Sequence, residues 1–120
     1  MESILLTIKK GLGIDAEFDG FDENVKMGIN TAFFNLNQLG VGPSSVFSIA
    51  GIDEVWEDFL ITDTDLEMIK SYILLKTRVF FDPPSTEYMN TAYANQIKEI
   101  EWRLMVYRDP EIPDEEEEVV

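Results

Sequence analysis

The chain has 120 residues, of which 24 are acidic and nine basic, and its formal net charge at pH 7 is −15. Phosphate backbones and anionic lipid surfaces are bound by clustered Lys and Arg, so this composition argues against ordinary nucleic-acid binding and against membrane-surface binding. The absence of cysteine and histidine excludes disulfides, thiolate nucleophiles, histidine bases and nearly all zinc chemistry.

The first predicted element is a short helix close to the N-terminus. Ser3 is a favourable N-cap, and the helix is expected to end at Gly11 or Gly13. An acidic residue precedes the apolar run and basic residues follow it, which is the reverse of the charge order in a signal peptide. No apolar run approaches the roughly 20 residues that a membrane span requires. Residues 14–21 are rich in Asp and Gly and predict a loop anchored by two phenylalanines. Four apolar residues share one face of the helix: Ile4, Leu5, Ile8 and Leu12.

A long second helix is predicted from Asp22, which is a good N-cap, to the stop signal Gly40-Val41-Gly42-Pro43. Its apolar residues recur at spacings of three and four, which is typical of a helix with one buried face. They are Val25, Ile29, Ala32 or Phe33, Leu36 and Leu39.

The run Val46-Phe47-Ser48-Ile49 is the best candidate for a β-strand in the chain. A single strand leaves its backbone groups unpaired. We therefore expect it to pair either with a local partner near residues 14–18 or with another subunit across a boundary.

Two further helices are expected before the proline-rich joint. Residues 53–60 form a short helix, and Thr64-Asp65-Leu66-Glu67 matches a capping box that starts a helix running to Phe81. The apolar surface of this longer helix is broader than one partner helix requires. It comprises Leu66, Ile69, Tyr72, Ile73, Leu75, Val79 and Phe80, with the stem of Lys76 on the same stripe.

The segment Phe81-Asp82-Pro83-Pro84 is a stiff corner, because two successive prolines cannot continue a helix. The last helix is predicted to begin near Ser85 and to end at Asp109-Pro110. Its apolar residues form a heptad-like seam. The seam consists of Met89, Tyr93, Ile97, Ile100, Leu104 and Tyr107.

Together these elements predict an all-α, antiparallel helical bundle with about four main helices, a short extra helix, one brief β-like segment and an acidic C-terminal arm. Residues 1–108 are expected to form one domain with a net charge of −8, from 17 acids and nine bases. Residues 109–120 contain seven acids and no base, and predict a flexible arm.

The Trp56-Glu57-Asp58-Phe59-Leu60 motif, the helix and corner at 66–85, and the segment Ile97-Lys98-Glu99-Ile100-Glu101-Trp102-Arg103-Leu104 of the last helix resemble the head-to-tail connector (adaptor, or head-completion) proteins of long-tailed double-stranded DNA bacteriophages. The resemblance covers roughly residues 20–107. It implies a small helical subunit that forms a homo-oligomeric ring, twelve-fold like the portal, in the neck of the virion. It further implies assembly in the host cytoplasm and partners in the portal protein, the next stopper or tail component, and passing DNA that is not read by sequence. It implies no catalysis.

Several residues are candidates for the contacts of such a ring, each with a plainer alternative. Trp56 and Trp102 are expected in the core, unless one lies in a subunit contact. Phe80 and Phe81 either lock the proline corner or insert into the next subunit. Lys76, Arg78, Arg103 and Arg108 are either solvated or face an acidic neighbour. The candidate interface residues are Val46, Phe47, Ile49, Trp56, Arg78, Phe80, Phe81, Arg103, Arg108, Glu115, Glu116, Glu117 and Glu118.

The acidic run Glu115–Glu118 either solubilises the chain, docks on a basic partner surface or imitates DNA. An acidic cluster around residues 53–65 lacks the ligand spacing of a calcium loop, so we expect no metal site. No set of residues supplies a nucleophile, base and electrophile, so we expect no catalytic residue and no cofactor. The alternative to a connector is an acidic helical regulator or DNA mimic that binds a basic host protein.

Overall fold

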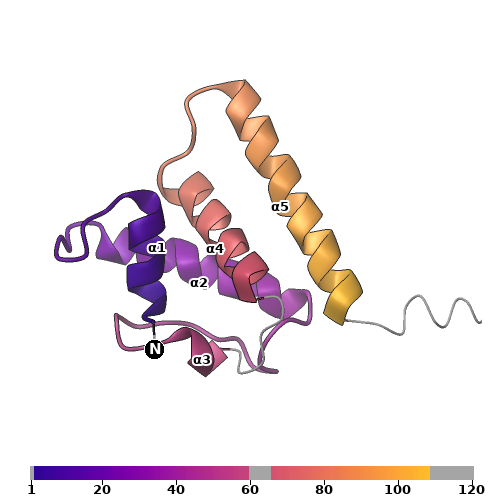
Figure 1. Cartoon of the computed structure of the whole chain (residues 1–120), viewed down its shortest axis with the longest axis horizontal. Helices are drawn as coiled ribbons and strands as arrows, with labels where there is room; N and C mark the ends of the chain where they lie inside the picture. Colours follow the sequence, from indigo (N-terminus) through magenta and orange to yellow (C-terminus); the bar gives the residue numbers. More distant parts are fainter. Residues whose placement is uncertain (1, 60–65, 109–120) are drawn as a thin grey trace, which may run out of the picture.

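The computed structural model describes residues 2–59 and 66–108, which form five α-helices and no β-strand (Figure 1). The predicted all-α fold is therefore confirmed. In Figure 1, α4 and α5 form an antiparallel pair, α2 crosses behind α4, and α1 lies beside them. The helices are α1 (Ile4–Leu12), α2 (Asp22–Gln38), α3 (Trp56–Phe59), α4 (Leu66–Phe81) and α5 (Glu87–Arg108).

Helix α1 begins and ends as its sequence predicts. The Ser3 hydroxyl accepts a hydrogen bond from the Leu6 amide at 3.3 Å, which satisfies one free amide of the first turn. At the other end Gly13 has φ +81°, a conformation that glycine adopts without steric cost. Of the two glycines considered, Gly13 is thus the C-cap.

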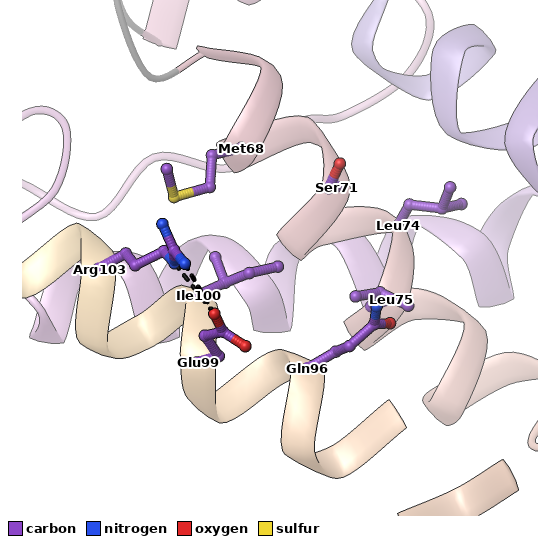
Figure 2. A pocket seen from close by; sticks show the side chains of 8 residues that line it. All are labelled: Met68, Ser71, Leu74, Leu75, Gln96, Glu99, Ile100 and Arg103. Atoms are coloured by element: carbon purple, nitrogen blue, oxygen red, sulfur yellow. Dashed lines mark hydrogen bonds and ion pairs between the residues drawn. The ribbon is translucent and has the colours of Figure 1, made fainter. Parts of the chain in front are cut away.

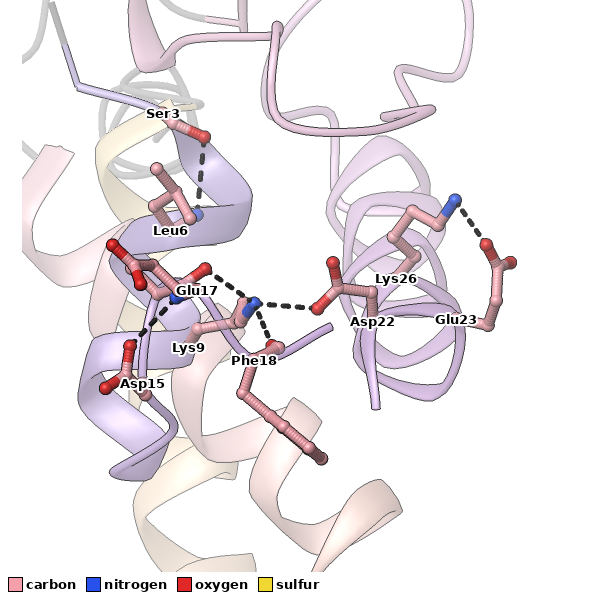
Figure 3. Close-up of polar contacts among 10 residues, drawn as sticks. Ser3, Leu6, Lys9, Asp15, Glu17, Phe18, Asp22, Glu23 and Lys26 are labelled. Carbon is pink, nitrogen blue, oxygen red and sulfur yellow. Dashed lines mark hydrogen bonds and ion pairs between the residues drawn. The ribbon is translucent and has the colours of Figure 1, made fainter. Parts of the chain in front are cut away.

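A buried lysine joins α1 to the start of α2 (Figure 3). The side chain of Lys9 is 1% exposed, and its ammonium lies 2.8 Å from Asp22 Oδ1. It also donates to the carbonyl oxygens of Ala16 at 3.2 Å and Phe18 at 2.7 Å. The predicted N-cap at Asp22 is wrong: α2 starts at Asp22, Phe21 occupies the cap position, and the carboxylate binds Lys9. An ammonium this deeply buried requires such compensation.

Within the described residues the segment 46–49 pairs with no strand, so the predicted local partner near residues 14–18 is wrong, and pairing with another subunit stays a prediction. The side-chain amide of Asn30, on α2, takes that place: its Oδ1 accepts from the Ile49 amide at 2.8 Å, and its Nδ2 donates to the Ile49 carbonyl at 3.0 Å. Lys26 donates to the adjacent Ala50 carbonyl at 2.9 Å. One amide side chain therefore satisfies both backbone groups that a neighbouring strand would otherwise satisfy.

The described residues contain one β-type backbone pairing, at a place that was not predicted. Ser3 and Val55 form an isolated antiparallel bridge, which fixes the N-terminus against the start of α3. Helix α3 is shorter than expected, with Trp56 and Phe59 buried. The predicted capping residue Thr64 lies outside the described residues.

Helices α4 and α5 follow their predicted extents closely. Helix α4 ends at Phe81, and α5 starts at Glu87 rather than near Ser85, with the Thr86 hydroxyl accepting from the Met89 amide at 3.2 Å. A single core unites residues from all five helices. In α5, Leu104 is fully buried, whereas Ile97 and Ile100 are half-buried. The last helix is thus attached to the body mainly through its second half.

We predict that Asn30→Ala destabilises the fold by about 1–3 kcal/mol, because it leaves the Ile49 amide and carbonyl without their partner. Urea unfolding followed by circular dichroism measures the change. Asn24→Ala, at an exposed position of the same helix, is the matched control and should change stability by less than about 0.5 kcal/mol. Equal effects of the two substitutions would contradict the anchoring role of Asn30.

Candidate functional site

Two of the candidate interface residues lie in the core, and a third packs against it. Ile49 and Trp56 are buried, and the Trp56 indole donates to the Thr7 hydroxyl at 3.1 Å. Phe47 is half-buried, with its ring centroid 4.9 Å from Phe33. Val46, by contrast, is exposed. Of the segment 46–49, only its first apolar residue is therefore widely open to a partner.

The two phenylalanines at the proline corner have different surroundings. Phe81 is half-buried and stacks edge-on against Phe21, with ring centroids 5.2 Å apart. Phe80 is 49% exposed and covers Gly28 of α2, where a Cβ would lie 3.2 Å from its ring. Phe81 thus locks the corner internally, and half of the Phe80 surface stays open.

The basic candidates do not form one continuous stripe. Arg78 donates to the Gly11 carbonyl at 3.2 Å, at the C-terminal end of α1, where a cation is favoured by the helix dipole. Arg103 forms a 2.8 Å ion pair with Glu99 one turn earlier on α5. Arg108 ends α5, and Glu115–Glu118 lie outside the described residues.

Helix α5 carries large exposed apolar residues, one of which was predicted to lie in the core. Trp102 is 63% exposed, so its predicted core position is wrong. It lies two residues before the buried Leu104, which places it about 160° away around the helix. That offset from the seam is a signal that the sequence already contained. Tyr88 and Met105 are exposed on the same helix.

An open groove runs between α4 and α5 (Figure 2). It has a volume of about 500 Å³. Its floor is apolar, and its rim carries the Glu99–Arg103 ion pair. This arrangement suits apolar docking of a protein segment better than chemistry on a small molecule. The lining residues are Met68, Ser71, Leu74, Leu75, Gln96, Glu99, Ile100 and Arg103.

One polar contact fixes α5 beside this groove. The buried Tyr72 hydroxyl donates to Glu101 Oε2 at 2.7 Å. Burial, and then the hydrogen bond to the Glu101 carboxylate, raise the pKa of Tyr72 above its ordinary value of 10.0. The bond therefore persists at neutral pH and ties the middle of α4 to the second half of α5.

Within residues 2–59 and 66–108, no three acidic side chains are placed to hold a metal ion, and no helix is long and apolar enough to cross a membrane. A small helical body with an apolar groove and exposed aromatic residues defines a protein-assembly module. The family of phage connector proteins matches residues 4–111, and the chain belongs to this family. It is a structural family whose members are components of the virion. No curated protein and no solved structure matches the chain.

We predict that Tyr72→Phe lowers the free energy of unfolding by about 1.5–3 kcal/mol, since it removes a hydrogen bond to a charged group. The pKa of Tyr72 is raised in the folded state, so its contribution is complete below about pH 10 and is lost as the pH rises further. Urea unfolding from pH 7 to 11 measures both effects. Tyr88→Phe, at an exposed tyrosine of α5, is the control. If the free energy of unfolding of Tyr72→Phe fell above pH 10 as steeply as that of the wild type, this assignment would be contradicted.

Proposed function

We propose that the protein is a head-to-tail connector, or adaptor, that forms a ring under the portal and joins the capsid vertex to the next connector or tail component. The observation that carries this proposal is the family match, which extends over residues 4–111 and so includes every described helix. The ring, its partners and its place in the neck of the virion belong to the proposal. Twelve subunits would match a twelve-fold portal.

The exposed surface supports an assembly role. Large apolar side chains stand open on α2, α4 and α5, in a chain too acidic to aggregate freely. We propose that the accessible members of the candidate set contact neighbouring subunits or the portal. They are Val46, Arg78, Phe80, Phe81 and Arg103.

Net charge supports passage of DNA through such a ring. A wall built from subunits of charge −15 repels phosphate, so DNA slides past it without being held, and no sequence is read. The same charge opposes closure of the ring, although salt limits the repulsion to a range of about 8–10 Å. The ring is therefore expected to need the portal as a template.

We further propose that residues 1–108 act as the adaptor domain and that residues 109–120 form an acidic arm. With seven acids and no base, this arm suits a basic surface of the portal or of the next connector. The same acidity favours the alternative function, a regulator or DNA mimic that binds a basic host protein. The two functions differ in the partner that they require.

We predict that the isolated protein sediments as a monomer or a weak oligomer and forms a stoichiometric ring when mixed with the portal protein of its own phage. Analytical ultracentrifugation and electron microscopy of the mixture measure this. Assembly should weaken at low ionic strength, because screening of the like-charged subunits is lost. A stable ring without the portal would contradict the template role, and no ring with it would favour the regulator.

We predict that deletion of residues 109–120 reduces portal affinity and makes it less sensitive to salt, since seven carboxylates are removed. The matched control keeps the length of the arm and replaces its seven acids by Gln and Asn. Titration against immobilised portal at two salt concentrations measures both variants. Unchanged affinity in both would assign the arm a solubilising role only.

A further inference from the structure

We propose that neighbouring copies of this chain join by inserting the outer ridge of α2 into the α4–α5 groove of the next copy. The ridge is formed by Met27, Thr31 and Phe34, and the groove is the one lined by Met68, Ser71, Leu75 and Ile100. The inference rests on the proposed ring and names the surfaces that close it. It adds contacts that the family match does not specify.

The ridge lies on the side of α2 that faces away from the core. Met27 lies two residues from the buried Val25 and Ile29, which places it about 160° from both around the helix. Phe34 follows Met27 by seven residues and shares its face. These two side chains are 58% and 47% exposed. Anchors at i, i+4 and i+7 form the usual pattern of a helix that binds in a groove.

The groove lies on the side of α4 that faces away from α2. Ser71 is about 160° around α4 from both Ile69 and Ile73, which are buried residues of the core. Thr77, on the Ile73 side of α4, lies against Gly28 of α2. Figure 1 shows α2 behind α4, and Figure 2 shows Met68, Leu75 and Ile100 around the groove. Ridge and groove are thus two different surfaces of one subunit, and Thr31, at the edge of the ridge, also lines a hollow with Phe80 of α4 and Ile97 of α5.

Two different complementary surfaces of one subunit make a heterologous contact, which repeats from copy to copy and closes into a ring when the rotation permits. A twelve-fold ring turns each copy by roughly 30° relative to the last. Neighbours therefore keep nearly the same orientation, and the back of one subunit faces the front of the next.

In this arrangement an acidic residue of one copy lies near basic residues of the next. Glu23 continues the ridge one turn before Met27, and its side chain is 84% exposed although it pairs with Lys26. Within one subunit, contact of Phe21 with Phe81 places the start of α2 beside the end of α4. Glu23 of one copy consequently approaches the α1 and α4 ends of the next.

Two basic residues lie near these ends of α1 and α4. Lys10 lines a second hollow, between α1 and α4, that shares Ser71 and Leu74 with the first groove. Arg78 follows Leu74 by one turn on the same face of α4. In the part of the chain that the structure describes, neither Lys10 nor Arg78 forms an ion pair with a carboxylate. A neighbour's Glu23 would supply one.

The size of the contact explains why a template is needed. Helix α2 has 17 residues, so it is about 25 Å long, and with a width of about 10–12 Å it covers a footprint of roughly 250–300 Å². A stable pair buries about 800 Å² on each partner. Two copies alone are held weakly, whereas subunits arranged on a portal each gain two such contacts.

The chain lacks cysteine, so introduced thiols report contacts directly. The double variant Thr31→Cys/Ser71→Cys, assembled on the portal and treated with a short bis-maleimide, should give a ladder of covalent multimers. Thr31→Cys/Thr91→Cys, with its second thiol at an exposed position of α5, should give none. A mixture of the two single variants Thr31→Cys and Ser71→Cys should stop at dimers, because each copy then carries one thiol.

Substitutions test the same contact without a cross-linker. Phe34→Glu and Ser71→Arg change exposed residues on the ridge and in the groove, so each should abolish ring formation while retaining the wild-type melting temperature. Mixing these two variants should restore a one-to-one dimer through the intact pair of surfaces, seen as a new species at high concentration. Tyr88→Glu, at an exposed aromatic residue outside both surfaces, should assemble normally.

Glu23→Lys should weaken assembly, and Lys10→Glu in the same chain should restore it.

A portal-bound ring of the wild type, combined with no ladder or with an equal ladder in the control, would overturn this interface and leave the connector function intact. A chain that forms no ring on its portal would overturn both. Normal assembly of Phe34→Glu would likewise exclude the ridge from the contact.

Discussion

The packing of α2 against α4 is the contact on which the other elements depend. Gly28 lets the two helices approach so closely that a Cβ there would lie 3.0 Å from the Thr77 methyl group and 3.2 Å from the Phe80 ring. The buried residues of both helices lie along this contact, including Ile29 and Ile73. Each helix uses one side for this contact; Asn30 and Lys26 on another side of α2 hold residues 49 and 50, and Met27 and Phe34 remain exposed.

Polar side chains from the helices, rather than a sheet, hold the long connections in place. Lys9 donates hydrogen bonds to the carbonyl oxygens of residues 16 and 18 and forms an ion pair with the Asp22 carboxylate. Asn30 satisfies both backbone groups of Ile49. Glu54 accepts from the amides of Ala50 and Gly51, and the Ala50 amide is the main cause that lowers its pKa below 4.5. These anchors let an all-helical body keep ordered loops.

Helix α5 is less embedded than the others, and this bears on function. It has 22 residues, and its buried contacts fall in its second half, around Leu104 and the Tyr72–Glu101 hydrogen bond. A stiff proline corner sets its direction. The consequence is a long helix whose apolar residues are divided between its own body and the surface. Such a division suits a subunit that completes its packing only in an assembly.

Local signals in the sequence determined the approximate extents of the four longer helices, the Ser3 cap, the glycine stops and the all-helical class, because periodicity and capping depend on near neighbours along the chain. Only the tertiary structure decided that Asn30 pairs with Ile49 and that Lys9 is buried beside Asp22. It also brought Met68, Ser71 and Leu75 of α4 beside Ile100 of α5 to form the groove. These outcomes rest on contacts between residues distant in sequence, and the burial of a side chain depends on which helix packs against it. Residue spacing shows which side chains share a face, but the packed neighbours decide which face is covered.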